Sequence, residues 1–262
     1  MRETPFTTEA FHIRRDGFRI VGTRYVPRKP NGVPVIISHG FLGTRQDVAR
    51  YAACLASEGC AVYTFDFVGG SPRTESDGRL QDMSVLTERD DLMAVMDHVR
   101  RDPAVDPGRL ILMGYSQGGF VSALTAAARP GEVDRLILFS PALCIPDDAR
   151  SGQMMFFQFD PHNVPDTVSS PDGALIIGRQ LIETAQPLDP MEAIRGYRGP
   201  VLLVHGKADR IVAYGYAERA RAAYGDNARL LGIDGADHEY RPEDDEIAMA
   251  AVRQFILGHG AR

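Results

Sequence analysis

The chain is organised around the stretch Gly114-Tyr115-Ser116-Gln117-Gly118-Gly119, where we expect a strand, a tight turn and a helix to meet. Residues 109–113, which precede it, form a short apolar run that is typical of a buried strand. Residues 120–128, which follow it, are small and apolar, as expected of a packed helix. The sequence therefore predicts a strand, turn and helix with a serine at the turn.

Ser116 has glycine two places away on either side, a spacing that is typical of a nucleophile elbow. The backbone of such a serine is strained, and a Cβ at Gly114 or Gly118 would collide with a neighbouring strand or helix. We expect the hydroxyl to stand above the edge of a sheet, at the N-terminus of a helix whose dipole favours developing negative charge.

Composition limits the classes of partner. With 262 residues, 44% hydrophobic and 24% charged, the chain fits one large globular domain. A net charge of −6 leaves no basic surplus for phosphates, so we expect no nucleic-acid partner. We find no metal-ligand spacing, dinucleotide fingerprint or phosphate loop, and we expect neither a cofactor nor a metal.

The location is predicted from what the chain lacks. Its first ten residues contain no apolar core of signal-peptide length, and we expect no membrane span because no run reaches about 18 apolar residues. Cys54, Cys60 and Cys144 are too few and too scattered for a disulfide framework or a zinc site. We interpret them as buried thiols of a cytoplasmic protein.

Strands and helices alternate along most of the chain. Asp16-Gly17 separates two alternating runs and predicts a hairpin. Buried strands are predicted at 35–38, 60–65, 109–113, 136–139, 200–205 and 229–233, and helices at 46–57, 86–100, 120–128, 216–224 and 247–257. This order predicts an α/β fold with a mostly parallel sheet and helices on both faces.

The alternation breaks after Ser140-Pro141. We therefore divide the chain into a core of residues 1–140 and 196–262 and an inserted lid, 141–195, with a helix over 175–184. The alternative is a connection with its own small core. The insertion carries Met154, Phe156, Phe157 and Phe159, and we expect part of this set to line a pocket above Ser116. A homodimer contact is the competing use.

The elbow within such a sheet resembles the α/β-hydrolases, in which the chain order is serine, acid, histidine. The acid then belongs after the strand 201–205, where Asp209 stands, and the base after the last strand, where His238 stands. We interpret Asp237 as a solvated loop charge and His205 as a structural histidine whose hydrogen bonds are satisfied.

Two loops offer donors for an oxyanion. One donor is the backbone N–H of Gln117, after the nucleophile, and our candidate for the other is the N–H of Phe41. His39 precedes Phe41 and is placed with the substrate-binding residues, with a simple turn at 39–40 as the alternative.

A narrower resemblance covers the chain from about residue 10 onward. The chain is similar to bacterial cinnamoyl (feruloyl) esterases, which carry a small lid, through His39-Gly40-Phe41, the elbow, Ser140-Pro-Ala142, Phe159-Asp-Pro161, Val164-Pro165, His205-Gly206, Asp209 and Asp237-His238. Those esterases often clamp the aromatic acid with a lid tryptophan, but this chain has none and shows Ser169 or Ser170 and Leu181 at the corresponding places.

The resemblance implies hydrolysis of a small-molecule ester by Ser116, His238 and Asp209. Hydroxycinnamoyl or other small acyl groups would lie against Met154 and Phe157, with Asp148 as the polar group for a phenol. For Asp148 a helix N-cap or a solvated charge is the alternative. A monoacylglycerol lipase or lysophospholipase remains open, an aminopeptidase is less favoured, and a non-catalytic ligand-binding homologue is the rival from another class.

Overall fold

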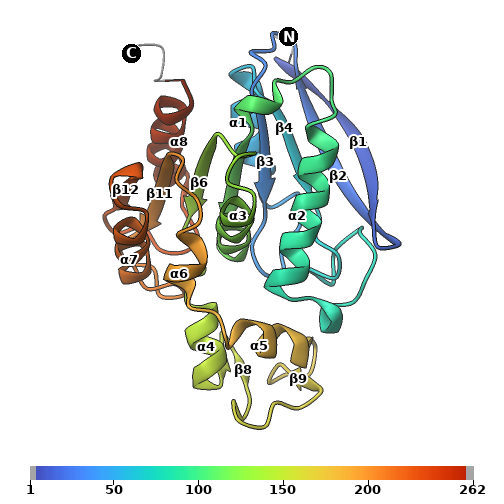
Figure 1. Cartoon of the computed structure of the whole chain (residues 1–262), viewed down its shortest axis with the longest axis vertical. Helices are drawn as coiled ribbons and strands as arrows, with labels where there is room; N and C mark the ends of the chain where they lie inside the picture. The colour runs from blue at the N-terminus through green and yellow to red at the C-terminus, as the bar shows by residue number, and fades with distance from the viewer. Residues whose placement is uncertain (1–3, 258–262) are drawn as a thin grey trace.

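The computed structural model describes residues 4–257 and contains an eight-stranded sheet between two layers of helices (Figure 1). The strands lie in the order β1 (Phe6–Arg15), β2 (Phe18–Pro27), β4 (Ala61–Phe65), β3 (Pro34–Ser38), β5 (Ile111–Tyr115), β6 (Arg135–Phe139), β11 (Val201–Gly206) and β12 (Ala228–Ile233). All pairs from β4 to β12 are parallel, and β1 and β2 add an antiparallel edge. The predicted fold class is confirmed.

The edge hairpin has the predicted turn. Arg15 pairs with Phe18, and Asp16 and Gly17 between them have φ values of +50° and +87°. A two-residue loop with both φ values positive matches the right-handed twist of the strands, which is why Asp-Gly is favoured there.

The sheet separates two hydrophobic cores, because side chains of a strand alternate between its faces. In β3, Ile36 belongs to the core formed with α2 (Val85–Val99), α3 (Gln117–Ala128) and α7 (Gly215–Tyr224). Val35 and Ile37 belong to the core formed with α1 (Ala49–Ser57) and α8 (Pro242–Leu257). Helices therefore cover both faces, as predicted.

The predicted first helix, 46–57, begins later, at Ala49. The N–H of Thr44 donates to the Asp47 carboxylate at 2.8 Å, and the N–H of Arg45 donates to the Asp66 carboxylate at 2.7 Å. These side-chain acceptors hold the segment in a turn, so the helix starts only after it.

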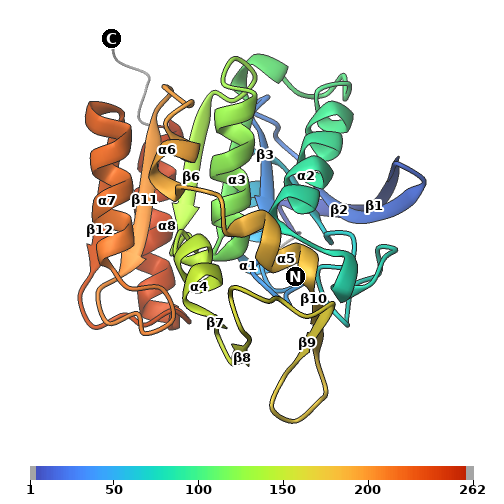
Figure 2. The same ribbon diagram turned by 60° about the horizontal axis from the view of Figure 1, so that its bottom comes forward.

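The insertion between β6 and β11 forms α4 (Ile145–Ser151), the ribbon of β7 (Gln153–Met154) and β8 (Phe157–Gln158), the ribbon of β9 (Thr167–Ser169) and β10 (Ile176–Gly178), and α5 (Arg179–Ala185). Figures 1 and 2 show these elements together beyond one end of the sheet. Helix α6 (Pro190–Ile194), later in the insertion, instead packs beside α3 and α7. Within residues 4–257, no helix combines the length and the apolar character needed to cross a bilayer.

The helix predicted over 175–184 is wrong in its first half. Ile176–Gly178 pairs with Thr167–Ser169, and the helix begins only at Arg179. A Cβ at Gly178 would lie 1.9 Å from the carbonyl oxygen of Gln81, so the strand runs directly against the short turn Leu80–Asp82. The two contacting segments are far apart in the sequence, so no local sequence pattern predicts this strand.

Candidate active site

Ser116 occupies the turn between β5 and α3 with a φ of +53°, where residues other than glycine are uncommon. Its N–H donates to the Phe139 carbonyl at 2.8 Å. A Cβ at Gly114 would lie 2.2 Å from the Gly118 carbonyl oxygen, and one at Gly118 would lie 2.3 Å from that of His39. Close packing therefore requires both glycines and holds the serine in its strained conformation.

Three buried side chains from different loops meet at this turn. His238, which follows β12, has its Nε2 3.0 Å from Ser116 Oγ and its Nδ1 2.8 Å from Oδ2 of Asp209, which follows β11. Because an ionised carboxylate only accepts, Nδ1 carries the proton and Nε2 accepts from the serine hydroxyl. The structure thus joins the three predicted residues in one hydrogen-bonded relay.

Asp209 is held as an ionised acceptor. Its Oδ1 accepts the N–H groups of Ile211 and Val212, both at 2.8 Å. Burial raises the pKa of Asp209, but the hydrogen bonds from His205, His238 and the backbone outweigh it and bring the pKa well below its usual range. The carboxylate therefore stays charged and orients His238.

Asp237 does not compete for the imidazole. This exposed carboxylate accepts the N–H of His238 at 2.7 Å and that of Arg210 at 3.3 Å, so it joins the histidine loop to the acid loop. The Tyr115 hydroxyl donates to the His238 carbonyl at 2.6 Å. The histidine loop is thus tied down from both sides, a role that the sequence did not indicate for either residue.

The predicted oxyanion donors flank Ser116. Neither the N–H of Phe41 nor that of Gln117 has an acceptor within residues 4–257. The loop that carries Phe41 touches the nucleophile, since a Cβ at Gly40 would lie 3.1 Å from Ser116 Cβ. Two free N–H groups beside a serine can stabilise an oxyanion without rearrangement.

His39 lies beneath this loop and does not line the cavity near Ser116. Its Nδ1 is 2.8 Å from the Gly40 carbonyl oxygen, and its Nε2 accepts the N–H of Phe67 at 3.3 Å. Burial lowers the pKa of His39 and favours the neutral ring. The expected contact of His39 with substrate does not fit this position, since the ring supports the loop from within.

Gln117 has a buried partner that no sequence pattern indicated. Its Nε2 donates to Oε2 of Glu88, a carboxyl on α2, at 2.7 Å. Burial raises the pKa of Glu88 to about 8. Glu88 falls on the apolar face of a helix, and only the position of α3 beside α2 makes it a neighbour of the site.

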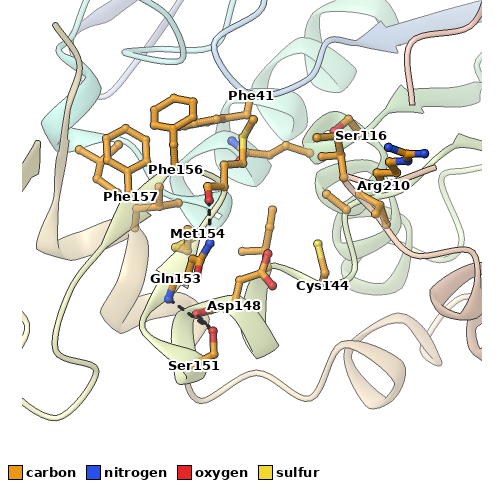
Figure 3. A pocket seen from close by; sticks show the side chains of 18 residues that line it. Phe41, Ser116, Cys144, Asp148, Ser151, Gln153, Met154, Phe156, Phe157 and Arg210 are labelled. Carbon is orange, nitrogen blue, oxygen red and sulfur yellow. Dashed lines mark hydrogen bonds between the residues drawn. The ribbon is translucent and has the colours of Figure 1, made fainter. Parts of the chain in front are cut away.

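A cavity of about 470 Å³ opens beside Ser116, and the insertion forms much of its wall (Figure 3). Most of the lining is apolar and comes from the insertion, from the Phe41 loop and from the segment after Asp209. The lining residues are Phe41, Ser116, Gln117, Ala142, Cys144, Ile145, Asp148, Ser151, Gln153, Met154, Met155, Phe156, Phe157, Ile177, Leu181, Arg210, Ile211 and Val212. Of the expected set, Phe159 instead packs against the core.

Asp148 faces this cavity from within α4 (Figure 3). The N-cap of α4 is Cys144, so the helix N-cap alternative for Asp148 is wrong. Burial raises the pKa of Asp148, and a hydrogen bond from the Cys144 thiol opposes the shift. Among the described residues its one side-chain donor is this thiol, so the half-buried carboxyl has acceptor capacity left for a ligand hydroxyl.

Comparisons with known proteins show which proteins this chain resembles. The structure is similar to that of Est1E from Butyrivibrio proteoclasticus with ferulic acid bound, at a TM-score of 0.86 and 29% identity, covering 96% of this chain and 100% of the other. In sequence, the chain is 25% identical to the human monoglyceride lipase, over 87% of this chain and 84% of the lipase. It is 27% identical to an uncharacterized protein of Mycobacterium tuberculosis, over 92% and 76% respectively.

The model of one family, described as serine aminopeptidase, S33, matches residues 29–175. The matched segment includes the Phe41 loop, the elbow and most of the elements that line the cavity. Because the match covers more than half of the chain, the protein belongs to this family of serine hydrolases, which has the α/β-hydrolase fold.

Proposed function

We propose that the protein hydrolyses carboxylic esters through an acyl-enzyme, with Ser116 as nucleophile, His238 as base and acid, and Asp209 as the group that orients His238. The observation that carries this proposal is the unbroken relay from Asp209 to His238 at 2.8 Å and from His238 to Ser116 at 3.0 Å. A non-catalytic binding protein needs no such relay.

The geometry supports the following steps. Ser116 Oγ attacks the ester carbonyl carbon while its proton moves to His238 Nε2, and the carbonyl electrons form an oxyanion held by the N–H groups of Phe41 and Gln117. The C–O bond to the alcohol then breaks, and the alcohol leaves with the proton from His238. Water repeats the sequence on the acyl-enzyme, giving one proton to His238, and the acid departs as Ser116 recovers its proton.

For the acyl group we propose a hydroxycinnamate or another small acid. Phe41, Met154 and Phe157 supply apolar walls, and the Asp148 carboxylate is available to accept a phenolic hydroxyl. The similarity to Est1E, whose structure was solved with ferulic acid, supports the same class. Without tryptophan, the walls hold a planar ring less tightly, so we expect activity on short acyl esters as well.

A monoacylglycerol substrate is the second candidate. The similarity to human monoglyceride lipase favours it, as do Met155 and Ile211, which extend the apolar lining. An aminopeptidase activity has less support, because Asp148 is the one carboxylate among the described lining residues, and a buried free amine needs acidic partners.

The tip of the β7–β8 ribbon exposes apolar side chains that could form a contact between two copies of the chain. Met155 and Phe156 are 47% and 38% exposed. A homodimer contact would cover these two side chains, and the homodimer stays a prediction. The cytoplasmic location also stays a prediction.

The proposal is tested by labelling with a fluorophosphonate, which reacts with an activated serine, and by hydrolysis of p-nitrophenyl acetate. We expect one label per chain, on Ser116, and loss of hydrolysis in proportion to labelling. Full hydrolysis by the labelled protein, or a label on another serine, would exclude this site.

A further inference from the structure

His205, the penultimate residue of β11, touches the proposed site from beneath and is fully buried. Its Nε2 lies 2.8 Å from the Val212 carbonyl oxygen and 3.2 Å from Asp209 Oδ2. Its Nδ1 is buried and has no partner in the part of the chain that the structure describes. The expectation that the hydrogen bonds of His205 are satisfied is therefore wrong for one ring nitrogen.

These neighbours fix the tautomer of His205. Both groups that face Nε2 are acceptors, so Nε2 carries a proton, which it donates to the Val212 carbonyl, with Asp209 Oδ2 as a second and more distant acceptor. A second proton on Nδ1 would leave a buried N–H without an acceptor, which is unfavourable. The ring is thus a neutral donor, shared between the acid of the relay and the backbone of the loop that carries it.

We propose that His205 is a positioning residue for Asp209. His205 holds the Asp209 carboxylate in place against His238 and weakens the electrostatic attraction between this carboxylate and the His238 proton. The inference rests on the proposed function. Asp209 Oδ2 accepts from two imidazoles, His238 at 2.8 Å and His205 at 3.2 Å, while Oδ1 is occupied by two backbone N–H groups. Both oxygens are held, so the carboxylate cannot rotate away from His238.

The shared oxygen couples His205 to the titration of His238. Loss of the His205 donor leaves more negative charge on Oδ2, which stabilises the protonated His238 ring. The acid limb, meaning the fall of kcat/KM as His238 becomes protonated, should then move to higher pH.

Three ionisable groups near the pair stay neutral over this range. Tyr115 on β5, Cys144 beside α4 and Tyr240 before α8 lie within electrostatic reach of Asp209, and burial raises the pKa of each, which keeps them neutral. The neighbouring charged side chains are exposed and screened by solvent, namely Arg210, Asp237 and Glu239.

Three variants separate the positioning role from a purely structural one. His205→Gln keeps an N–H near the place of Nε2, His205→Asn moves its donor to the place of Nδ1, and His205→Leu removes it. The quantities to measure are kcat, KM and the pH profile of kcat/KM with p-nitrophenyl acetate, after thermal unfolding has verified the fold. His205→Asn keeps a polar side chain and carries the test if the leucine variant does not fold.

We expect His205→Leu and His205→Asn to lose about ten- to hundredfold in kcat with little change in KM. Their acid limbs should rise by about half a pH unit or more, whereas His205→Gln stays near the wild type. An acid limb that does not move, or a loss expressed mainly in KM through displacement of Val212, would overturn the proposal. So would a glutamine variant as impaired as the leucine variant.

The wild-type protein separates the two proposals. If it neither hydrolyses the ester nor reacts with a fluorophosphonate at Ser116, the proposed function fails. If it does both and the His205 variants keep the wild-type acid limb, only the positioning role fails.

Discussion

The side chain of Gln117 and the carboxyl of Glu88 form a buried hydrogen bond of 2.7 Å directly behind the proposed oxyanion hole. The same Gln117 offers its backbone N–H to the oxyanion. The residue is therefore fixed on one side by α2 and presents its free donor on the other, which spares the site a reorganisation during the reaction.

Glu88 should make stability depend on pH. Burial raises the pKa of Glu88 to about 8, so the folded state keeps a proton that the unfolded chain releases near its ordinary pKa. The contribution of Glu88 to the free energy of unfolding is fully present below that ordinary pKa. It falls as the pH rises toward 8, by up to about 1.4 kcal/mol per pH unit.

The side chain in Glu88→Gln stays neutral at every pH and can keep the hydrogen bond to Gln117. This variant should therefore lack the part of the pH dependence of the unfolding free energy that Glu88 causes. The measurement is urea unfolding of both proteins at several pH values between about 5 and 8. If the difference in the free energy of unfolding between the two proteins does not change with pH, Glu88 is already ionised in the folded state.

Two matched substitutions show which of the two aspartates, Asp209 or Asp237, orients His238. Asp209→Asn leaves His238 with the wrong tautomer and should lower kcat by about 10³- to 10⁴-fold. Asp237→Asn changes a carboxylate whose hydrogen-bond partners within residues 4–257 are backbone N–H groups, and it should lower kcat less than about tenfold. The assignment is wrong if ester kinetics show the Asp237 variant to be the more impaired.

The loop that carries Phe41 should tolerate no side chain at Gly40. In Gly40→Ala the new Cβ would stand 3.1 Å from Ser116 Cβ and 3.4 Å from Tyr115, pushing the loop from the nucleophile. We expect kcat to fall by about ten- to hundredfold with little loss of stability. Gly131→Ala is the matched control, because its Cβ meets nothing within 4 Å. Equal kinetics for the two variants would exclude a constrained oxyanion loop.

The acyl pocket makes a prediction about substrate. Asp148→Asn should lower kcat/KM for methyl ferulate by about tenfold and leave methyl cinnamate, which lacks the phenol, nearly unchanged. The wild type should turn over methyl ferulate and also methyl butyrate. A butyrate preference above about a hundredfold, roughly 2.7 kcal/mol, would reject the hydroxycinnamate class.

Much of this fold could be predicted because its signals are local. The turn at Asp16-Gly17 and the elbow at Ser116 are encoded within a few residues, and the strand ends then indicated where Asp209 and His238 should stand.

The missed features depend on contacts between distant segments. The strand at Ile176–Gly178 exists because it pairs with Thr167–Ser169. Glu88 reaches the site only through the packing of α2 on α3, and His205 reaches Asp209 only because the chain turns back beneath it. None of these leaves a pattern along the sequence.

The role of Ser116 as nucleophile is tested by kcat for p-nitrophenyl acetate in Ser116→Ala, compared with the wild type under identical conditions. We expect a loss of several orders of magnitude, about 10³-fold or more, with thermal unfolding nearly unchanged, because only the nucleophile is removed. Retention of more than about a tenth of wild-type activity by a correctly folded variant would show that Ser116 is not the nucleophile.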